Sequence, residues 1–212
     1  MNVLEERSMK NRQPEILIAT RNTGKIRELE ILLADLPFRL RGLNSFSNIF
    51  DPEETGATFT ENAVLKAKSY SLQTKLLSIA DDSGLQVEAL NGAPGVFSAR
   101  YAGEDASDQD RIKKLLGELN EIRQRRARFV CVMAVADQEG DVKFIEEGVC
   151  SGTIALSARG AHGFGYDPIF IPDGFSATFG ALPNAVKQQI SHRARAVAKI
   201  IQQLRRFYAA LT

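Results

Sequence analysis

Two adjacent carboxylates follow a short apolar segment near the middle of the chain. Residues 76–80 predict a buried strand, and directly after it come Asp81, Asp82, Ser83 and Gly84. In α/β sheets, ligands bind at the carboxyl ends of the strands, which is where these acids would lie. Neighbouring carboxylates repel each other and lose hydration when buried, so a cation such as Mg²⁺ would stabilise them. The alternative is an ordinary turn, with Asp82 capping backbone amides and Asp81 pointing to solvent.

A turn of small and polar residues near the start of the chain could bind phosphate. It consists of Thr20, Arg21, Asn22, Thr23, Gly24 and Lys25. The turn precedes a predicted helix, whose N-terminus offers free backbone N–H groups and the positive end of the helix dipole, and Lys25 adds a full charge. It is not a Walker A loop, because Ala19 and Ile26 replace the Gly and the Ser or Thr of that motif. An ordinary strand-to-helix turn with a solvated lysine is the alternative.

Two further acids, Glu53 and Glu54, lie in a loop between the second predicted strand and the next helix. Mg²⁺ commonly keeps several water ligands and takes one or two carboxylates together with substrate phosphates. These glutamates are therefore candidate partners of Asp82 in a cation site, and an aspartate beside such an ion can position or deprotonate an attacking water. Solvated loop acids are the alternative.

The last quarter of the chain carries aromatic and charged residues suited to a nucleobase. They are Phe164, Gly165, Tyr166, Asp167, Lys187, His192 and Arg193. An aromatic pair on a glycine-hinged loop can stack on a base, an aspartate can accept hydrogen bonds from base or sugar, and a basic pair at a helix start favours an anion. A structural histidine and a core Phe164 are the alternatives. A phosphate cradle, metal-binding acids and a base clamp are together the parts of a nucleotide site.

Alternating strands and helices separate these groups along the first half of the chain. The pattern predicts a strand at residues 15–20, a helix ended by Pro37, a strand at 38–43, a helix from the capping box of Thr58 and Glu61 to about residue 75, and the strand to residue 81. This β-α-β-α-β opening is typical of α/β folds.

The second half predicts a helix capped by Ser107 and Asp110, a hairpin of strands at 128–136 and 142–149, one more strand at 152–157, and a last helix at 194–208. We expect one α/β unit at residues 15–212, with a long mixed sheet pinched into two lobes around a cleft. Residues 1–14 are predicted to be a frayed tail.

Composition narrows the classes of function. The 212 residues are 44% hydrophobic and 25% charged, as in ordinary soluble proteins, and the net charge of +1 gives no support to a general nucleic-acid or membrane binder. A local basic run (Arg123, Arg125, Arg126 and Arg128) is interpreted as a solvated approach to a strand. No apolar run approaches the roughly 18 residues of a membrane span, and the tail lacks the apolar core of a secretory signal. Cys131 and Cys150 have no metal-type spacing, so reduced thiols and a cytoplasmic location are expected, although the residues alone leave a disulfide open.

With these residues in hand, the chain resembles the inosine triphosphate pyrophosphatase family from about residue 16 to residue 207. The matching stretches are residues 19–25, 53–56, 59–63 with Lys66, 79–85, 92–101, 164–168 and 190–193. The resemblance implies an elongated mixed β-sheet flanked by helices that form two lobes with a central cleft. It further implies Mg²⁺-dependent hydrolysis of deaminated purine nucleoside triphosphates (ITP, dITP, XTP) to the monophosphate and pyrophosphate, by a homodimer.

The resemblance also implies roles for individual residues. Asp82 matches the catalytic proton acceptor, which also binds Mg²⁺, and Glu53 matches the other acidic metal ligand. Residues 20–25 match the triphosphate-binding loop, and Lys66 matches a further basic contact. The remaining matches to substrate contacts are Ser83, Phe164, Gly165, Tyr166, Asp167, Lys187, His192 and Arg193.

Two other functions stay open at this point. One is a related pyrophosphatase that acts on modified pyrimidine or 7-methylated nucleotides with a different base clamp. The other is a nucleotide sensor without turnover. A dinucleotide oxidoreductase is disfavoured, because no G-x-G-x-x-G motif opens a helix in this chain.

Overall fold

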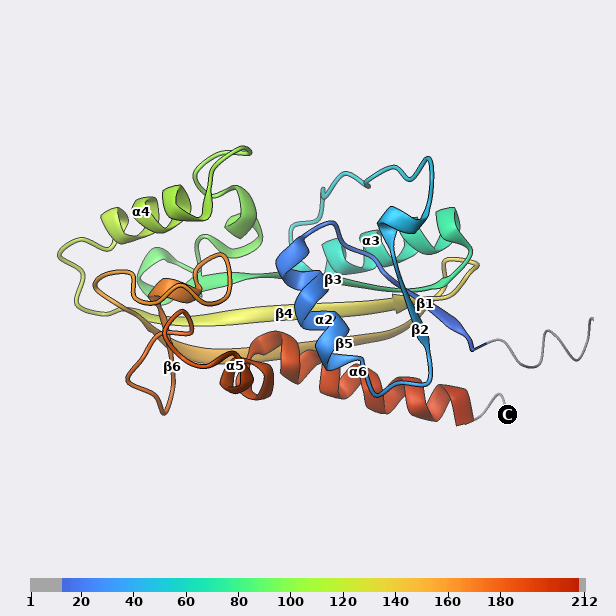
Figure 1. The fold of residues 1–212 in the computed structure, drawn as a ribbon. Helices are drawn as coiled ribbons and strands as arrows, with labels where there is room; N and C mark the ends of the chain where they lie inside the picture. Colours follow the sequence, from blue (N-terminus) through green and yellow to red (C-terminus); the bar gives the residue numbers. More distant parts are fainter. Residues whose placement is uncertain (1–12, 210–212) are drawn as a thin grey trace, which may run out of the picture.

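The computed structural model describes residues 13–209, and within them the strands form one long six-stranded mixed sheet (Figure 1). The strands are β1 (Glu15–Ile18), β2 (Arg39–Gly42), β3 (Leu77–Val87), β4 (Arg126–Ala136), β5 (Val142–Ile154) and β6 (Phe170–Pro172). They lie in the order β2-β1-β3-β4-β5-β6. The first three are parallel, whereas β3 to β6 pair antiparallel.

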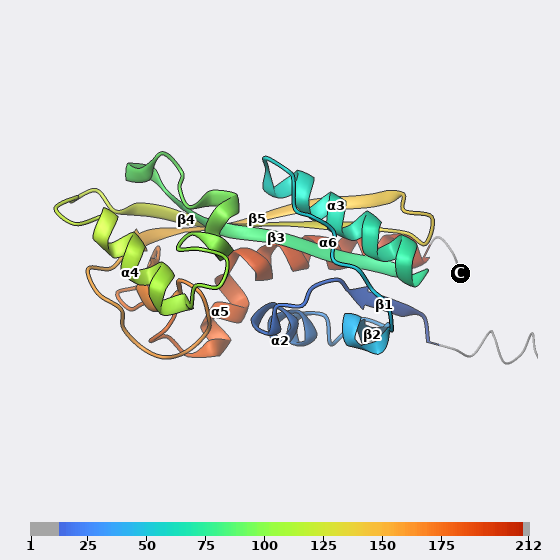
Figure 2. The same cartoon turned by 90° about the horizontal axis from the view of Figure 1, so that it is seen from above.

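Helices cover both faces of this sheet. They are α2 (Thr23–Leu32), α3 (Phe59–Thr74), α4 (Asp108–Glu118), α5 (Asn184–Ile190) and α6 (His192–Ala209), with short 3-10 helices η1 (Leu43–Ser45), η2 (Glu88–Leu90), η3 (Gly95–Arg100) and η4 (Asp167–Ile169). Helices α2 and α6 pack on one face and α3 packs on the other (Figure 2). No helix within residues 13–209 is long and apolar enough to cross a membrane.

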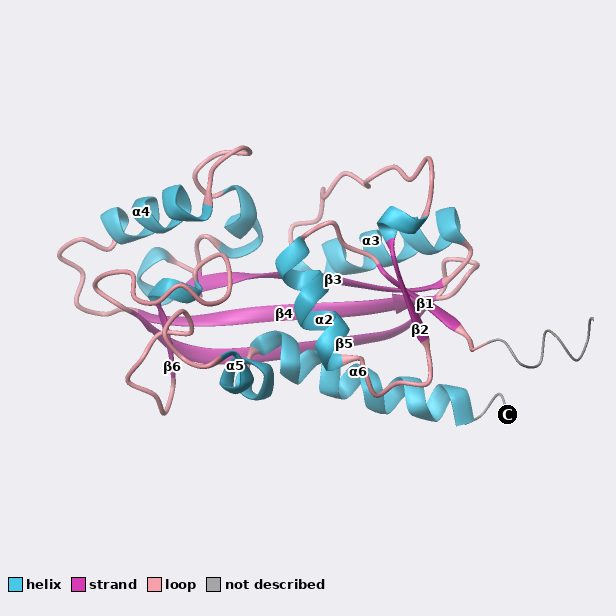
Figure 3. Ribbon diagram, viewed as in Figure 1, coloured by secondary structure: helices cyan, strands magenta, loops and turns pink. Residues whose placement is uncertain are grey.

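The buried apolar side chains form separate cores, and these cores divide the molecule into two lobes. One lobe contains the packing of α2, α3 and α6 on the middle strands, and the other contains a separate core beneath α4 with aromatic residues from β4, β6 and the following loop. Long loops at residues 46–58 and 155–166 border the two lobes (Figure 3). The predicted elongated mixed sheet with helices and two lobes is confirmed.

The strand order reverses at β1, and part of β3 has no neighbouring strand on the side of β1. Strand β1 connects through α2 to β2 on one side, and the chain returns through α3 to β3 on the other. Ile18 of β1 pairs with Ile79, and β3 then runs on to Val87 beyond the end of β1. Such a switch point at the carboxyl end of parallel strands is where α/β sheets bind ligands.

The predicted end of the strand at Asp81 is wrong, and so is the turn at Ser83-Gly84. Each of residues 81–84 pairs with a residue of β4, for example Asp82 with Val132. Tertiary pairing with this apolar strand overrides the turn preference of the Asp-Ser-Gly sequence. Because side chains alternate along a strand, Asp81 and Asp82 project from opposite faces of the sheet.

Other predictions have mixed outcomes. The capping boxes of α3 and α4 are present, with Thr58 and Ser107 each accepting a hydrogen bond from the backbone three residues on. The extra strand at 152–157 is wrong, because β5 continues without a break to Ile154. Helix α2 ends at Leu32, before the predicted stop at Pro37. Both cysteines are buried free thiols. The predicted tail lies outside the described residues, except for its last two positions.

Gly84 is required for the contact between β3 and η3. A Cβ atom at this position would lie 2.3 Å from the Gly95 carbonyl oxygen and 2.4 Å from Ser98 Oγ. We therefore expect Gly84→Ala to lower the free energy of unfolding by about 1–3 kcal/mol, as overpacking does. Urea unfolding would measure it, with Gly117→Ala on exposed α4 as a control that stabilises by about 0.5–1 kcal/mol. A Gly84→Ala protein as stable as the parent would contradict this packing.

Candidate active site

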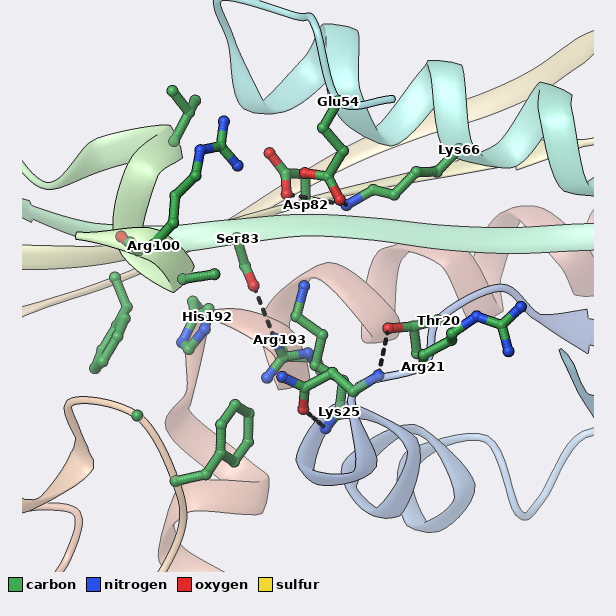
Figure 4. Close-up of a pocket in the computed structure, with 18 of the residues that line it drawn as sticks. Thr20, Arg21, Lys25, Glu54, Lys66, Asp82, Ser83, Arg100, His192 and Arg193 are labelled. Carbon is green, nitrogen blue, oxygen red and sulfur yellow. Dashed lines mark hydrogen bonds and ion pairs between the residues drawn. The ribbon is translucent and has the colours of Figure 1, made fainter. Parts of the chain in front are cut away.

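A cavity of about 320 Å³ lies along the free edge of β3, between the two lobes (Figure 4). Most of the predicted site residues line it: Thr20, Arg21, Asn22, Lys25, Lys66, Asp82, Ser83, Phe164, Gly165, Tyr166, Asp167, Lys187, His192 and Arg193. Three predicted residues do not line it. Thr23 and Gly24 face a neighbouring hollow beside α2, and Glu53 is exposed in its loop.

The predicted phosphate turn is built by local side-chain caps. Asn22 caps α2, its side-chain oxygen accepting a hydrogen bond from the Lys25 backbone N–H at 3.0 Å. Thr20 Oγ1 accepts a hydrogen bond from the Asn22 N–H at 3.2 Å. Arg21 turns outward and pairs with Asp51 at 2.6 Å. The Lys25 side chain and the N-terminal end of α2 therefore face the cavity. Both are positive, so this end of the cavity suits an anion.

Asp81 is buried on the α2 and α6 face of the sheet and does not line the cavity. One of its oxygens lies 3.0 Å from Lys25 Nζ and 3.1 Å from Arg193 Nη2. The other oxygen has no hydrogen-bond partner among residues 13–209. Burial favours the protonated acid, but the charges of Lys25 and Arg193 outweigh it and hold the pKa of Asp81 well below its usual range. Asp81 is therefore an ionised carboxylate that holds two cations.

Asp82 projects from the opposite face, toward α3. Its carboxylate lies 3.0 Å from Lys66 Nζ and accepts a hydrogen bond from Asn62 Nδ2 at 3.3 Å. Burial raises the pKa of Asp82, and the charge of Lys66 offsets this only in part. Burial also disfavours the charge on Lys66, but Asp82 and the nearby acids raise the pKa of this lysine above its usual value. The two adjacent acids thus have different partners and different basicity.

Glu54 is the loop acid that reaches this pair. Its carboxylate lies 3.2 Å from Lys66 Nζ, whereas the neighbouring Glu53 is exposed. Within residues 13–209, no three His, Cys, Asp or Glu side chains converge on a point where they could hold a metal. The carboxylates of Asp82 and Glu54 are suited to a hard cation that takes its other oxygens from phosphate and water. The role of Glu53 as a ligand stays a prediction.

The predicted base loop is held in shape by Asp167. Its carboxylate accepts a hydrogen bond from the Phe164 backbone N–H at 2.8 Å and pairs with Lys187 at 2.5 Å. Gly163 and Gly165 on either side of Phe164 have φ angles of +77° and +61°, which favour glycine. In this structure Asp167 therefore serves the loop and Lys187.

The two aromatic residues of the loop have different surroundings. Phe164 is half-buried at the cavity, and Lys187 Nζ lies 4.7 Å from the centre of its ring. Tyr166 is buried in the core beneath α4, and its hydroxyl donates a hydrogen bond to the Ser98 carbonyl oxygen at 2.9 Å. Phe164 is thus the ring available for stacking, and Tyr166 ties the loop to η3.

His192 and Arg193 close the wall beneath β3. The imidazole of His192 stacks on Phe129 with ring centres 4.7 Å apart. In the described part of the chain, its Nδ1 has no hydrogen-bond partner. Burial, with the charge of Arg193 as a smaller cause, lowers the pKa of His192 well below its usual value, so the ring is neutral. Arg193 donates hydrogen bonds to Glu28, Asp81 and Ser83 Oγ. Its guanidinium is therefore fixed by protein groups.

Several residues at the site were given no role from the sequence. They are Glu28, Asn62, Ser98, Arg100, Asp108 and Arg111. Three of them, Asn62, Ser98 and Arg100, nevertheless lie in stretches that match the family. Glu28 pairs with both Lys187 and Arg193, which lie in α5 and α6. It stands three residues after Lys25, on the same side of α2, and this spacing alone could have suggested it.

Replacing Asp81 by Asn is expected to lower the free energy of unfolding by about 3–5 kcal/mol at pH 7, because Lys25 loses its carboxylate partner and Arg193 keeps only Glu28. The depressed pKa makes this contribution complete above the unfolded-state pKa of about 3.9 and lets it fall at lower pH. Urea unfolding should therefore show a smaller difference between variant and parent at pH 3 than at pH 7. Asp105→Asn, at an exposed position, is the control. Equal stabilities at pH 7 would contradict the role of Asp81.

Known proteins resemble this chain over nearly its whole length. The model of the Ham1 family matches residues 16–203. A dITP/XTP pyrophosphatase of Bacillus anthracis is 48% identical over 193 residues, which cover 90% of this chain and 96% of that protein. One from Vibrio parahaemolyticus is 44% identical over 193 residues, covering 90% and 96%.

Solved structures agree with this match. A HAM1 protein from Coxiella burnetii superposes with a TM-score of 0.83 at 43% identity, covering 91% of this chain and 99% of that one. A nucleoside-triphosphatase, also named dITP/XTP pyrophosphatase, from Mycobacterium abscessus gives 0.70 at 40% identity, covering 88% and 97%. The resemblance found from the sequence motifs is confirmed, and the chain belongs to the Ham1 family.

Proposed function

We propose that this protein is a Mg²⁺-dependent pyrophosphatase that converts ITP, dITP and XTP to the nucleoside monophosphate and pyrophosphate. The observation that carries the proposal is that Lys25, Lys66 and Asp82 share one cavity, at the free edge of β3, with Phe164 and His192. The names of the relatives, dITP/XTP pyrophosphatases, support dITP and XTP as substrates. The family likeness also supports a cytoplasmic homodimer, which light scattering of the purified protein would test.

The phosphate chain would be held by positive groups on both faces of β3. Lys25 and the N-terminus of α2 lie on one side, and Lys66 lies on the other. Phosphoryl transfer depends mainly on positioning and on neutralising the charge of the transition state, which these groups can do. Mg²⁺, held by Asp82 with Glu53 or Glu54 and by the phosphates, would withdraw further charge from the phosphate oxygens.

Asp82 would orient the attacking water and accept its proton. In the proposed reaction the water oxygen bonds to the α phosphorus, and the bond from this phosphorus to the bridging oxygen breaks. The electron pair of that bond leaves with pyrophosphate, and the proton of the water passes to Asp82. The carboxylate of Asp82 lies at the cavity beside Lys66, where it can accept a proton from the water.

Recognition of the base would use the wall opposite the phosphates. Hypoxanthine and xanthine carry a 6-keto oxygen and a protonated N1, whereas adenine presents the reverse polarity. His192 and Phe164 both line this wall. Within residues 13–209 the Nδ1 of the neutral His192 has no hydrogen-bond partner, so it could bind a polar group of the base, and Phe164 offers a stacking surface. A site built to hydrogen-bond one pattern leaves buried groups unpaired against the other, which can discriminate by about 10⁴.

A substrate panel tests the proposed specificity. We expect ITP, dITP and XTP to release pyrophosphate in the presence of Mg²⁺, and ATP to do so about 10⁴-fold less efficiently in kcat/KM. Chelation of the cation should stop the reaction. GTP, UTP, TTP and m7GTP complete the panel, since preference for a pyrimidine or a methylated base would replace the proposed substrates. Equal rates for all nucleotides would end the specificity claim, and binding of ITP with no turnover would indicate a sensor.

The role of Asp82 is tested by substitution. Asp82→Asn should lower kcat for ITP by about 10²–10⁴ if this residue accepts the proton. Pyrophosphate release at saturating Mg²⁺ would measure it, and comparison of Glu53→Gln with Glu54→Gln would show which glutamate supports the cation. Glu139→Gln, on the exposed hairpin loop, is the control. Turnover near the parent value in Asp82→Asn would refute the assignment.

A further inference from the structure

The cations that line the cavity differ in whether the protein already neutralises them. They are Arg21, Lys25, Lys66, Arg100, Arg111, Lys187 and Arg193. Within residues 13–209, every one of them except Arg100 contacts a protein carboxylate at hydrogen-bond distance. The nearest carboxylate to Arg100 belongs to Glu104, at 3.9 Å, and that side chain is 84% exposed. Its guanidinium packs over the Phe97 ring, 5.1 Å from the centre.

Hydrogen bonds hold the backbone around Arg100 against β3, the strand that carries Asp82. Arg100 is the last residue of η3, which lies on the free edge of β3. Ser98 Oγ accepts a hydrogen bond from the Leu85 N–H at 2.9 Å and donates one to the Gly95 carbonyl at 2.6 Å. The hydroxyl of Tyr166 also donates a hydrogen bond to the Ser98 carbonyl oxygen. Arg100 is therefore presented to the cavity from a fixed position.

The side chain of Arg100 enters the cavity from the lobe that contains α4. Figure 4 shows its guanidinium on the same side of β3 as Glu54, Lys66 and Asp82, and directed toward them. Ser83, His192 and Arg193 lie on the other side of the strand. A nucleotide whose base rests against His192 would thus extend its outer phosphates past Asp82, between Lys66 and Arg100.

Within residues 13–209, Arg100 is a cation of this region that no carboxylate neutralises at hydrogen-bond distance. Lys66 already pairs with two acids, so a polyphosphate must share or displace that pairing. The guanidinium of Arg100, by contrast, has no carboxylate at hydrogen-bond distance among the described residues. A guanidinium binds phosphate through two parallel hydrogen bonds, which are stronger than those between neutral groups.

We propose that Arg100 is a substrate-contacting residue whose guanidinium binds the β and γ phosphates and stabilises the departing pyrophosphate. This rests on the proposed function, since it assigns a further contact in the same site. In the reaction described above, pyrophosphate receives the electron pair of the broken P–O bond. Arg100 then neutralises negative charge that increases on this group as the bond breaks.

The test measures the binding of each reaction product, pyrophosphate and IMP, by itself. Calorimetry of the full chain with Mg²⁺ would measure the affinity of Arg100→Gln for inorganic pyrophosphate and for IMP, beside steady-state hydrolysis of ITP. We expect pyrophosphate affinity and kcat/KM to fall by about 10- to 100-fold, as for lost hydrogen bonds to a charged group. IMP affinity should be unchanged. Arg100→Lys, which keeps the charge without the fork, should give an intermediate loss.

Glu104→Gln is the matched control, because it removes the nearest carboxylate and leaves the guanidinium in place. It should bind pyrophosphate and hydrolyse ITP as the parent does. Parent-like pyrophosphate affinity in Arg100→Gln would overturn the proposal and leave Arg100 as a solvated side chain on Phe97. An equal loss for IMP and pyrophosphate, with a lower Tm, would overturn it in favour of a structural role. A parent protein inactive on all deaminated purines would refute the proposed function instead, and pyrophosphate binding would still decide the role of Arg100.

Discussion

The site depends on the alternation of side chains along β3, which separates two carboxylates that are adjacent in sequence. Asp81 and Asp82 face opposite layers of helices, and each has its own cations: Lys25 and Arg193 on one face, Lys66 on the other. Two buried acids on one face would have repelled each other or shared a proton. On opposite faces, Asp81 is fully neutralised and fixes the framework, while Asp82 keeps a raised pKa at the cavity.

The same arrangement connects the two ends of the cavity. Arg193, in the base wall, shares Asp81 with Lys25 of the phosphate turn, and Glu28 of α2 binds Arg193 and Lys187. The ring of Phe164 also packs against this turn, since a Cβ atom at Gly24 would lie 2.5 Å from it. The elements proposed to hold base and phosphates are therefore in contact before a nucleotide binds. Pre-organisation of this kind lowers the entropy cost of binding.

Local signals in the sequence were sufficient for the elements that have their own caps. The capping boxes at Thr58 and Ser107 predicted the starts of α3 and α4, because the caps involve only residues within one turn. The Asp-Ser-Gly turn failed because pairing with β4, some fifty residues on, decides that conformation. Helix α5 and strand β6 are too short to show a period.

The sequence predicted most residues of the site but not the contacts between them. The motifs identified most of the side chains at the cavity, yet the partners of Arg193 are Glu28 and Asp81, which are 165 and 112 positions away. No spacing in the sequence predicts such a pairing, because it depends on how α2 and α6 pack on the same face of the sheet. Glu54, rather than Glu53, reaches Lys66 for a similar reason, since the path of the loop decides it.

A crystal structure with Mg²⁺ and the α,β-methylene analogue of ITP, which resists hydrolysis, would test the account most directly. The phosphates should lie across the uncovered edge of β3 between Lys25 and Lys66, with the cation on Asp82 and with Asp81 still bound to Lys25 and Arg193. A nucleotide bound outside this cleft, or a cation held by Asp81 in place of its two basic partners, would contradict it.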